Sequence, residues 1–160
     1  MTAGDDAPAL GTPRVATGVG MFLGEGPLWD PIRGVLLWVD IEDGSVYRGV
    51  FAFGGSIEIQ ERIAFPDTAG TVAVAASGEM VVAGTRSLFF RTPDGAITAG
   101  PDLVSGEGRR FNDGKPDPQG RLVVGTKGPD GSDAETLLRV EHDGSATVRR
   151  TGGGSTPSTR

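Results

Sequence analysis

The sequence predicts an all-β protein, and three observations support this. Glycine supplies 27 residues and proline 11, both above ordinary usage for a chain of 160 residues. The apolar residues lie in short runs such as Val35–Val39, which have the length of strands. No stretch of about 11 residues or more shows a helical period, because Gly, Pro and Asp-Gly signals interrupt each candidate. Length alone gives no reason to divide the chain, so we expect one domain.

A repeat organises these short strands. Each of three segments has a turn glycine, an apolar strand, a second short strand that ends in arginine and, usually, a closing Asp-Gly. A period of about 40 to 50 residues built from short strands is typical of β-propeller blades. The turn glycines are Gly34, Gly78 and Gly120, spaced by 44 and 42 residues, and the arginines are Arg48, Arg91 and Arg139, spaced by 43 and 48.

Further strand candidates lie between the repeat cores and bring the total to roughly four strands per repeat, the complement of a blade. We therefore expect about three blades over residues 14–150, between flexible ends at 1–13 and 151–160. Closed propellers have at least about four blades, so the sequence predicts a fold truncated at its C-terminus. Its bare blade edges make a homodimer possible. The additional candidates are Arg14 to Val19, Ser56 to Ile63, Gly70 to Ala76, Ala96 to Ala99 and Ala146 to Arg150.

Charge and composition exclude several classes of partner. The net charge of −6 and the scattered arginines argue against nucleic acid. No apolar run approaches the ~18 residues of a membrane span, and the acidic start lacks the features of a signal peptide, so we expect a cytoplasmic protein without a membrane partner. The chain has no cysteine, which excludes disulfides and thiolate chemistry.

Two short motifs carry the candidate site residues. Glu25 stands between two glycines and before Pro27, and it is either a solvated loop residue or a carboxylate at the channel of the propeller. The stretch "FNDGK" is either a hairpin turn or part of a site. Arg110 and Asn112 flank Phe111, so in an extended segment both point to the same side and form a cradle for a polyhydroxylated or carboxylate ligand. The single histidine, His142, is expected to be a solvated turn residue.

Three motifs resemble, in order and spacing, the first half of the senescence marker protein, gluconolactonase and luciferin-regenerating enzyme family, which includes regucalcin. They are "GEGPLWD" from Gly24, "LLWVDI" from Leu36 and "RRFNDGKPDPQGRLVVGT" from Arg109, and the match covers residues 14–148. The resemblance implies a six-bladed propeller with one divalent cation (calcium, zinc, manganese or magnesium) in its channel. It also implies a metal-dependent hydrolase that acts on lactones of sugar acids.

The resemblance assigns a role to four residues. Glu25 matches a metal-binding glutamate, Arg110 and Asn112 match substrate-binding residues, and a substrate-side carboxylate falls near Asp130. In the implied mechanism the cation polarises the lactone carbonyl, and a carboxylate assists the attacking water. The remaining metal ligands and the general base of the family have no counterpart here, so the catalytic base is unknown. The alternative is a non-catalytic or inactive propeller fragment that binds a ligand or partner without metal.

Overall fold

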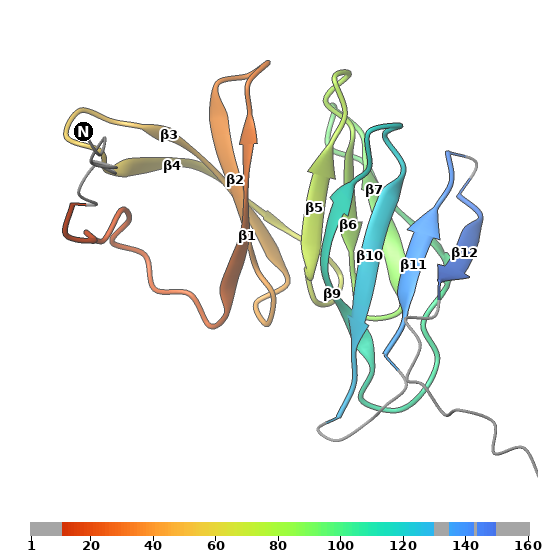
Figure 1. The fold of residues 1–160 in the computed structure, drawn as a ribbon. Helices are drawn as coiled ribbons and strands as arrows, with labels where there is room; N and C mark the ends of the chain where they lie inside the picture. The colour runs from red at the N-terminus through yellow and green to blue at the C-terminus, as the bar shows by residue number, and fades with distance from the viewer. Residues whose placement is uncertain (1–10, 130–134, 143, 150–160) are drawn as a thin grey trace, which may run out of the picture.

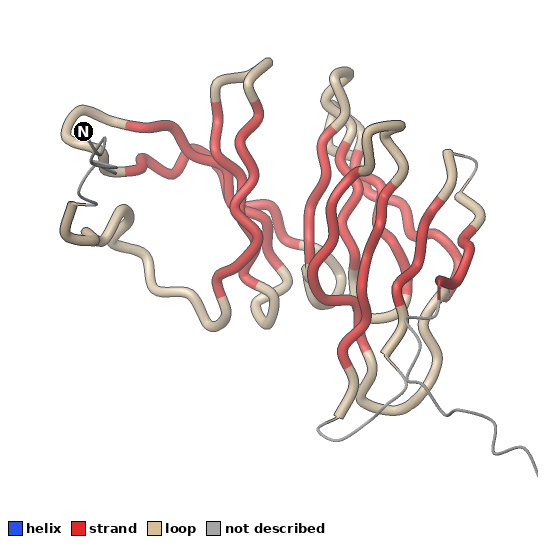
Figure 2. Tube along the Cα trace, in the orientation of Figure 1, coloured by secondary structure: helices blue, strands red, loops and turns tan. Residues whose placement is uncertain are grey.

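The computed structural model describes residues 11–129, 135–142 and 144–149. The strands in these ranges form three separate four-stranded antiparallel sheets, and no helix is assigned there (Figures 1 and 2). Nor does the described part of the chain contain a helix with the length and apolar character needed to cross a membrane. The prediction of an all-β fold with three propeller blades is confirmed.

Each sheet is one blade, and its strands follow in chain order from the inner to the outer edge. Strand β5 contacts both β1 and β9, so the first strands of the three blades are neighbours. Blade 1 consists of β1 Gly24–Asp30, β2 Val35–Asp40, β3 Ser45–Phe51 and β4 Ile57–Ala64. Blade 2 consists of β5 Thr71–Val74, β6 Met80–Ala83, β7 Ser87–Arg91 and β8 Ile97–Asp102. Blade 3 consists of β9 Arg110–Pro116, β10 Leu122–Lys127, β11 Leu137–Val140 and β12 Ala146–Arg149.

The turn glycines of the repeat lie where the sequence places them. Gly34, Gly78 and Gly120 follow the inner strand of each blade and have φ angles of +65°, +97° and +79°. A side chain with a Cβ rarely adopts this backbone region, which explains why glycine recurs at the same position of each repeat.

One expected strand is wrong. Residues 14–19 form no strand, and the backbone hydrogen bond that ties them to a blade runs from the Ile57 amide to the Ala16 carbonyl at 2.7 Å. Val15 is 89% exposed. Strand preference reflects the packing of a half-buried side chain, and this segment buries too little of its apolar surface to extend the sheet.

Two apolar cores lie between the blades. Alternate residues along the strands contribute to them, as expected for pleated strands buried on one face. The first core lies between blades 1 and 2 and includes Leu37, Val39, Val46, Val72, Met80, Val82 and Phe89. The second lies between blades 2 and 3 and includes Ala83, Leu88, Phe111, Leu122, Val124, Leu138 and Val140.

A charged clamp joins blades 1 and 2. Arg33 Nη1 donates to the buried Asp30 carboxylate at 2.7 Å, and Arg33 Nη2 donates to the Ala76 carbonyl of blade 2 at 2.8 Å. Burial raises the pKa of Asp30, but the hydrogen bonds from Arg33 and from the amides of Arg33 and Ile32 outweigh it and hold that pKa below its ordinary value. Asp30 is therefore ionised in its buried position.

Candidate functional site

The candidate site lies at one end of the blades, which we call the mouth: the end at which β1, β5 and β9 begin. Figure 1 shows these three inner strands running in the same direction from this end. Blades 2 and 3 are in close contact at Gly70, just before β5, where an added Cβ would lie 2.7 Å from the Asn112 carbonyl oxygen and 2.9 Å from that of Phe111. Thr71 Oγ1 donates to the Gly114 carbonyl at 2.9 Å. The start of β5 is thus pressed against the backbone of β9.

Arg110 and Asn112 lie together at the start of β9. Arg110 Nη1 donates to Asn112 Oδ1 and to the Phe111 carbonyl, both at 2.8 Å. Phe111 points the other way and is fully buried in the second core. The expectation that Arg110 and Asn112 share one side of the strand is therefore confirmed, and the buried phenyl ring between them fixes the strand against blade 2.

The Asn-Asp-Gly sequence is not a hairpin turn, because Asn112, Asp113 and Gly114 all lie inside β9. The bend occurs as a bulge instead: Val124 pairs with Gly114, whereas Thr126 pairs with Phe111, so Asn112 and Asp113 face a single residue of β10. Bulges bend a strand and redirect side chains, and they are frequent next to active sites.

Glu25 lies at the start of β1 and is exposed. A second bulge follows it, because Glu25 pairs with Val39 and Leu28 with Leu37, which leaves Gly26 and Pro27 opposite one residue of β2. Gly26 has a φ of +60°. The inner strands β1 and β9 are therefore both irregular at the mouth, beside Glu25 and at Asn112.

Asp40, which the sequence analysis did not single out, anchors the backbone at Phe22 and Leu23, just before Glu25. Its side chain is 1% exposed; Oδ2 accepts the Phe22 amide at 2.8 Å and Oδ1 accepts the Leu23 amide at 2.9 Å. A buried carboxyl group needs hydrogen-bond partners such as these two amides. The signal in the sequence was an aspartate at the end of the apolar run "LLWVD", where a buried carboxylate needs such donors.

A second unanticipated set of contacts supports β9 from the neighbouring loops. Asp67 Oδ1 accepts the Thr85 amide at 3.0 Å, and the Thr85 carbonyl accepts the Phe111 amide at 3.2 Å. Thr68 and Thr85 also join through their hydroxyls at 3.1 Å. The loop before β5 thus helps to hold the backbone between Arg110 and Asn112.

The described residues do not form a complete metal site. In residues 11–129, 135–142 and 144–149 no group of three His, Cys, Asp or Glu side chains is placed to hold a metal ion. Hard divalent cations require about six to eight oxygen ligands, so Glu25 does not suffice. Asp130 lies outside the described residues. His142 is exposed in a turn, as expected, where its Nε2 lies 3.1 Å from the Gln119 carbonyl oxygen.

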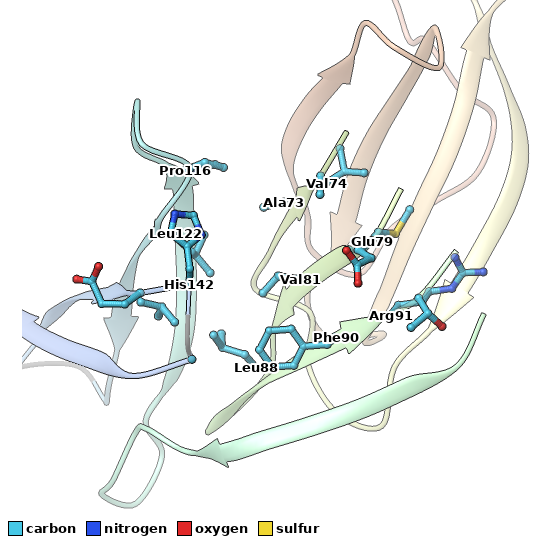
Figure 3. A pocket seen from close by; sticks show the side chains of 17 residues that line it. Ala73, Val74, Glu79, Val81, Leu88, Phe90, Arg91, Pro116, Leu122 and His142 are labelled. Carbon is cyan, nitrogen blue, oxygen red and sulfur yellow. The ribbon is translucent and has the colours of Figure 1, made fainter. Parts of the chain in front are cut away.

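A cavity of about 530 Å³ lies elsewhere, between blades 2 and 3. Figure 3 shows Val81, Leu88 and Phe90 of blade 2 facing Leu122 of blade 3, with other lining residues around them. Pro116, the last residue of β9, also lines it, whereas Arg110 and Asn112 lie at the first end of that strand. The cavity is a gap between blade faces and is separate from the mouth.

Comparison with known proteins identifies the family. The model of the SMP-30/gluconolactonase/LRE-like region matches residues 23–158. The chain belongs to this family. Among its curated relatives, a pentonolactonase of Haloferax volcanii is 31% identical over 132 residues, and a 6-deoxy-6-sulfogluconolactonase of Pseudomonas putida is 30% identical over 129 residues. These alignments cover 82% and 79% of the chain but 43% of each relative.

Solved structures of the family have the same blades. The calcium-binding protein regucalcin from Agrobacterium tumefaciens is 30% identical, with a TM-score of 0.71 over 86% of this chain and 46% of that protein. A luciferin-regenerating enzyme is 25% identical, with a TM-score of 0.67 over 80% of this chain and 45% of that protein. The chain therefore spans less than half the length of the relatives it matches, and its three blades correspond to about half of their six-bladed propeller.

Proposed function

We propose that the mouth of this chain binds lactones of sugar acids and serves their hydrolysis, with Arg110 and Asn112 as the substrate-binding residues. The observation that carries the proposal is the hydrogen bond of 2.8 Å between these two side chains at the bulge of β9. Two of the family relatives are named as lactonases of sugar acids, which supports the same class of substrate.

The chemistry of the pair favours a ligand rich in acceptors. A guanidinium only donates, so the Asn112 atom that faces Arg110 is the carbonyl oxygen, and the amide Nδ2 with its two N–H groups points elsewhere. Among the described residues, the side-chain hydrogen bonds of Arg110 both come from Nη1, so its Nε and Nη2 groups are the donors that we assign to a ligand. Lactone carbonyl, ring oxygen, hydroxyl and carboxylate groups all supply matching acceptors.

In hydrolysis, these donors have two tasks. Arg110 holds hydroxyl or carboxylate oxygens of the substrate, and Asn112 Nδ2 donates to the lactone carbonyl, whose oxygen gains negative charge as water attacks. Because Nη1 of Arg110 fixes the orientation of the Asn112 amide, the donor is aligned before the substrate arrives. We assign no residue of the described chain as the general base.

Among the described residues, Glu25 is the carboxylate that we assign to a divalent cation, whether calcium, zinc, manganese or magnesium. The described residues contain no group of three His, Cys, Asp or Glu side chains placed to hold a metal ion, so we derive no step of the reaction through a metal. This observation favours a second candidate function, in which the chain binds a sugar acid or a partner without metal and does not hydrolyse the lactone.

Binding and turnover separate the two functions. We expect gluconate, the product of gluconolactone hydrolysis, to bind the 160-residue chain in isothermal titration calorimetry. A hydrogen bond from a charged donor is worth about 1.5 to 3 kcal/mol, so losing one such bond in the Arg110→Ala variant should lower affinity roughly 10- to 100-fold. The matched control is Arg121→Ala, because Arg121 follows the turn at the opposite end of β9 and pairs with Asp117.

A pH-stat assay on gluconolactone with and without calcium then tests hydrolysis. Turnover that Asn112→Ala abolishes and Arg121→Ala retains would support the lactonase. Gluconate binding without turnover would support the non-catalytic function. Equal binding by the Arg110→Ala variant and the unaltered chain would contradict both, because each rests on this pair.

A further inference from the structure

Blades 1 and 3 each have a face that does not pack on blade 2. The leading face of a blade is the face that points toward the preceding blade in the chain. The trailing face is the opposite face. The leading faces of blades 2 and 3 and the trailing faces of blades 1 and 2 form the two cores. Within the described residues, no blade precedes blade 1 and none follows blade 3.

Equivalent positions in the repeat indicate that the leading face of blade 1 packs against another blade. Val82 and Val124, four residues after the turn glycines Gly78 and Gly120, lie on the leading faces of their blades and are fully buried against the preceding blade. The residue at the same position of blade 1 is Trp38. Each of the three pairs with a large apolar residue of the next strand: Trp38 with Tyr47, Val82 with Phe89 and Val124 with Leu138.

This leading face of blade 1 is aromatic and partly exposed. Trp38 stacks on Tyr47 with ring centroids 5.6 Å apart, and Trp29 contacts Phe51 at 5.9 Å. Trp29 and Phe51 are 48% and 56% exposed, whereas Trp38 and Tyr47, nearer the centre of this face, are buried. Contiguous exposed apolar surface of this kind marks an interface.

The trailing face of blade 3 is the other face that no blade covers within the described residues. Leu138 and Val140 of β11 point into the second core, so the alternation of the strand places Leu137 and Arg139 on the trailing face. Val123 lies there too, one residue before the buried Val124. Its equivalent in blade 2, Val81, packs against blade 3, which shows that this position normally contacts a following blade.

We infer that two copies of this chain close one propeller ring, with the leading face of blade 1 in each copy packed on the trailing face of blade 3 in the other. Three blades are half of a six-bladed ring, and the chain covers 46% and 45% of the two solved relatives. Half a ring closes with a second copy through a two-fold axis along the channel, which gives two identical contacts and leaves no blade face bare.

What the dimer means for the site at the mouth rests on the proposed function. A two-fold axis along the channel would bring Glu25, Arg110 and Asn112 of both copies around one opening. The site of a single copy would then be half of the site of the assembly. The association can be measured without lactone or metal, so failure of the ring is distinguishable from failure of the proposed function.

Sedimentation velocity of the 160-residue chain tests the inference, with a dimer of twice the 16.5 kDa mass of the chain as the expected result. Trp29→Glu on the leading face and Leu137→Lys on the trailing face should each weaken the dimer roughly 100-fold, since symmetry places each substitution in the assembly twice. Phe53→Glu is the control, because Phe53 is fully exposed in the turn between β3 and β4, outside the sheet face. Circular dichroism checks that each variant is folded.

Mixing the two variants gives the sharpest test. A mixed dimer has one unaltered contact and one contact that carries both substitutions, so the mixture should dimerise more tightly than either variant alone. A monomeric unaltered chain at tens of micromolar would overturn the inference. So would a dimer that Trp29→Glu disrupts and Leu137→Lys does not, because two copies would then meet through blade 1 alone.

Discussion

Gly70→Ala tests whether the contact between β5 and β9 supports the site. Where the backbone accepts it, replacement of glycine by alanine stabilises a protein by about 0.4 to 1 kcal/mol, and Gly70 has no positive φ. Here, however, the new Cβ would lie 2.7 Å from the Asn112 carbonyl oxygen and 2.9 Å from that of Phe111. These are backbone atoms, so relief requires the strands to separate.

Overpacking of this kind costs about 1 to 3 kcal/mol. For a chain of this size we expect the Tm to fall by roughly 3 to 9 °C, measured by differential scanning calorimetry. Gluconate affinity should fall as well, because the displaced carbonyl groups belong to the site. One is that of Asn112, a donor residue, and the other is that of Phe111, which lies between Arg110 and Asn112. Gly125→Ala is the matched control: Gly125 is a strand glycine whose added Cβ would meet only the Asp113 carbonyl oxygen, at 3.8 Å. A Gly70→Ala variant as stable as this control would refute the reasoning.

Three further predictions concern stability and the cation. The pKa of Asp30 is lowered in the fold, so its contribution is full above the ordinary value of 3.8 and is lost as pH falls through the lower folded value; Asp30→Asn should flatten the decline of Tm below about pH 4. Thr71→Val should cost about 1 to 3 kcal/mol in urea unfolding, because the Gly114 carbonyl loses its donor. Millimolar calcium should leave the Tm of the monomeric Trp29→Glu variant unchanged, and a rise that Glu25→Gln abolishes would contradict the incomplete site.

The repeat made the fold predictable from the sequence. Turn glycines at Gly34, Gly78 and Gly120 require a backbone that glycine adopts readily, and the strands between them alternate apolar residues that must be buried. The segment at residues 14–19 was mispredicted, because strand preference alone does not say whether a sheet edge will accept another strand.

The site was predictable only in part. Alternation was enough to place Arg110 and Asn112 on one side of a strand, with Phe111 on the other. Alternation did not predict the bulge, in which Asn112 and Asp113 lie opposite a single residue of β10. A bulge depends on how two strands pair, which the sequence of one strand does not determine. The support from Asp40 depends on contacts between segments 17 and 18 residues apart, which no local pattern encodes.

The central claim is that Arg110 and Asn112 recognise a sugar acid at the mouth. The most direct measurement is a gluconate titration of the isotope-labelled chain, observed through the side-chain amide of Asn112 and the guanidinium of Arg110 by NMR. We predict that both signals shift together and saturate with one affinity. Shifts confined to residues that line the cavity between blades 2 and 3, such as Leu122 and Phe90, would contradict the account.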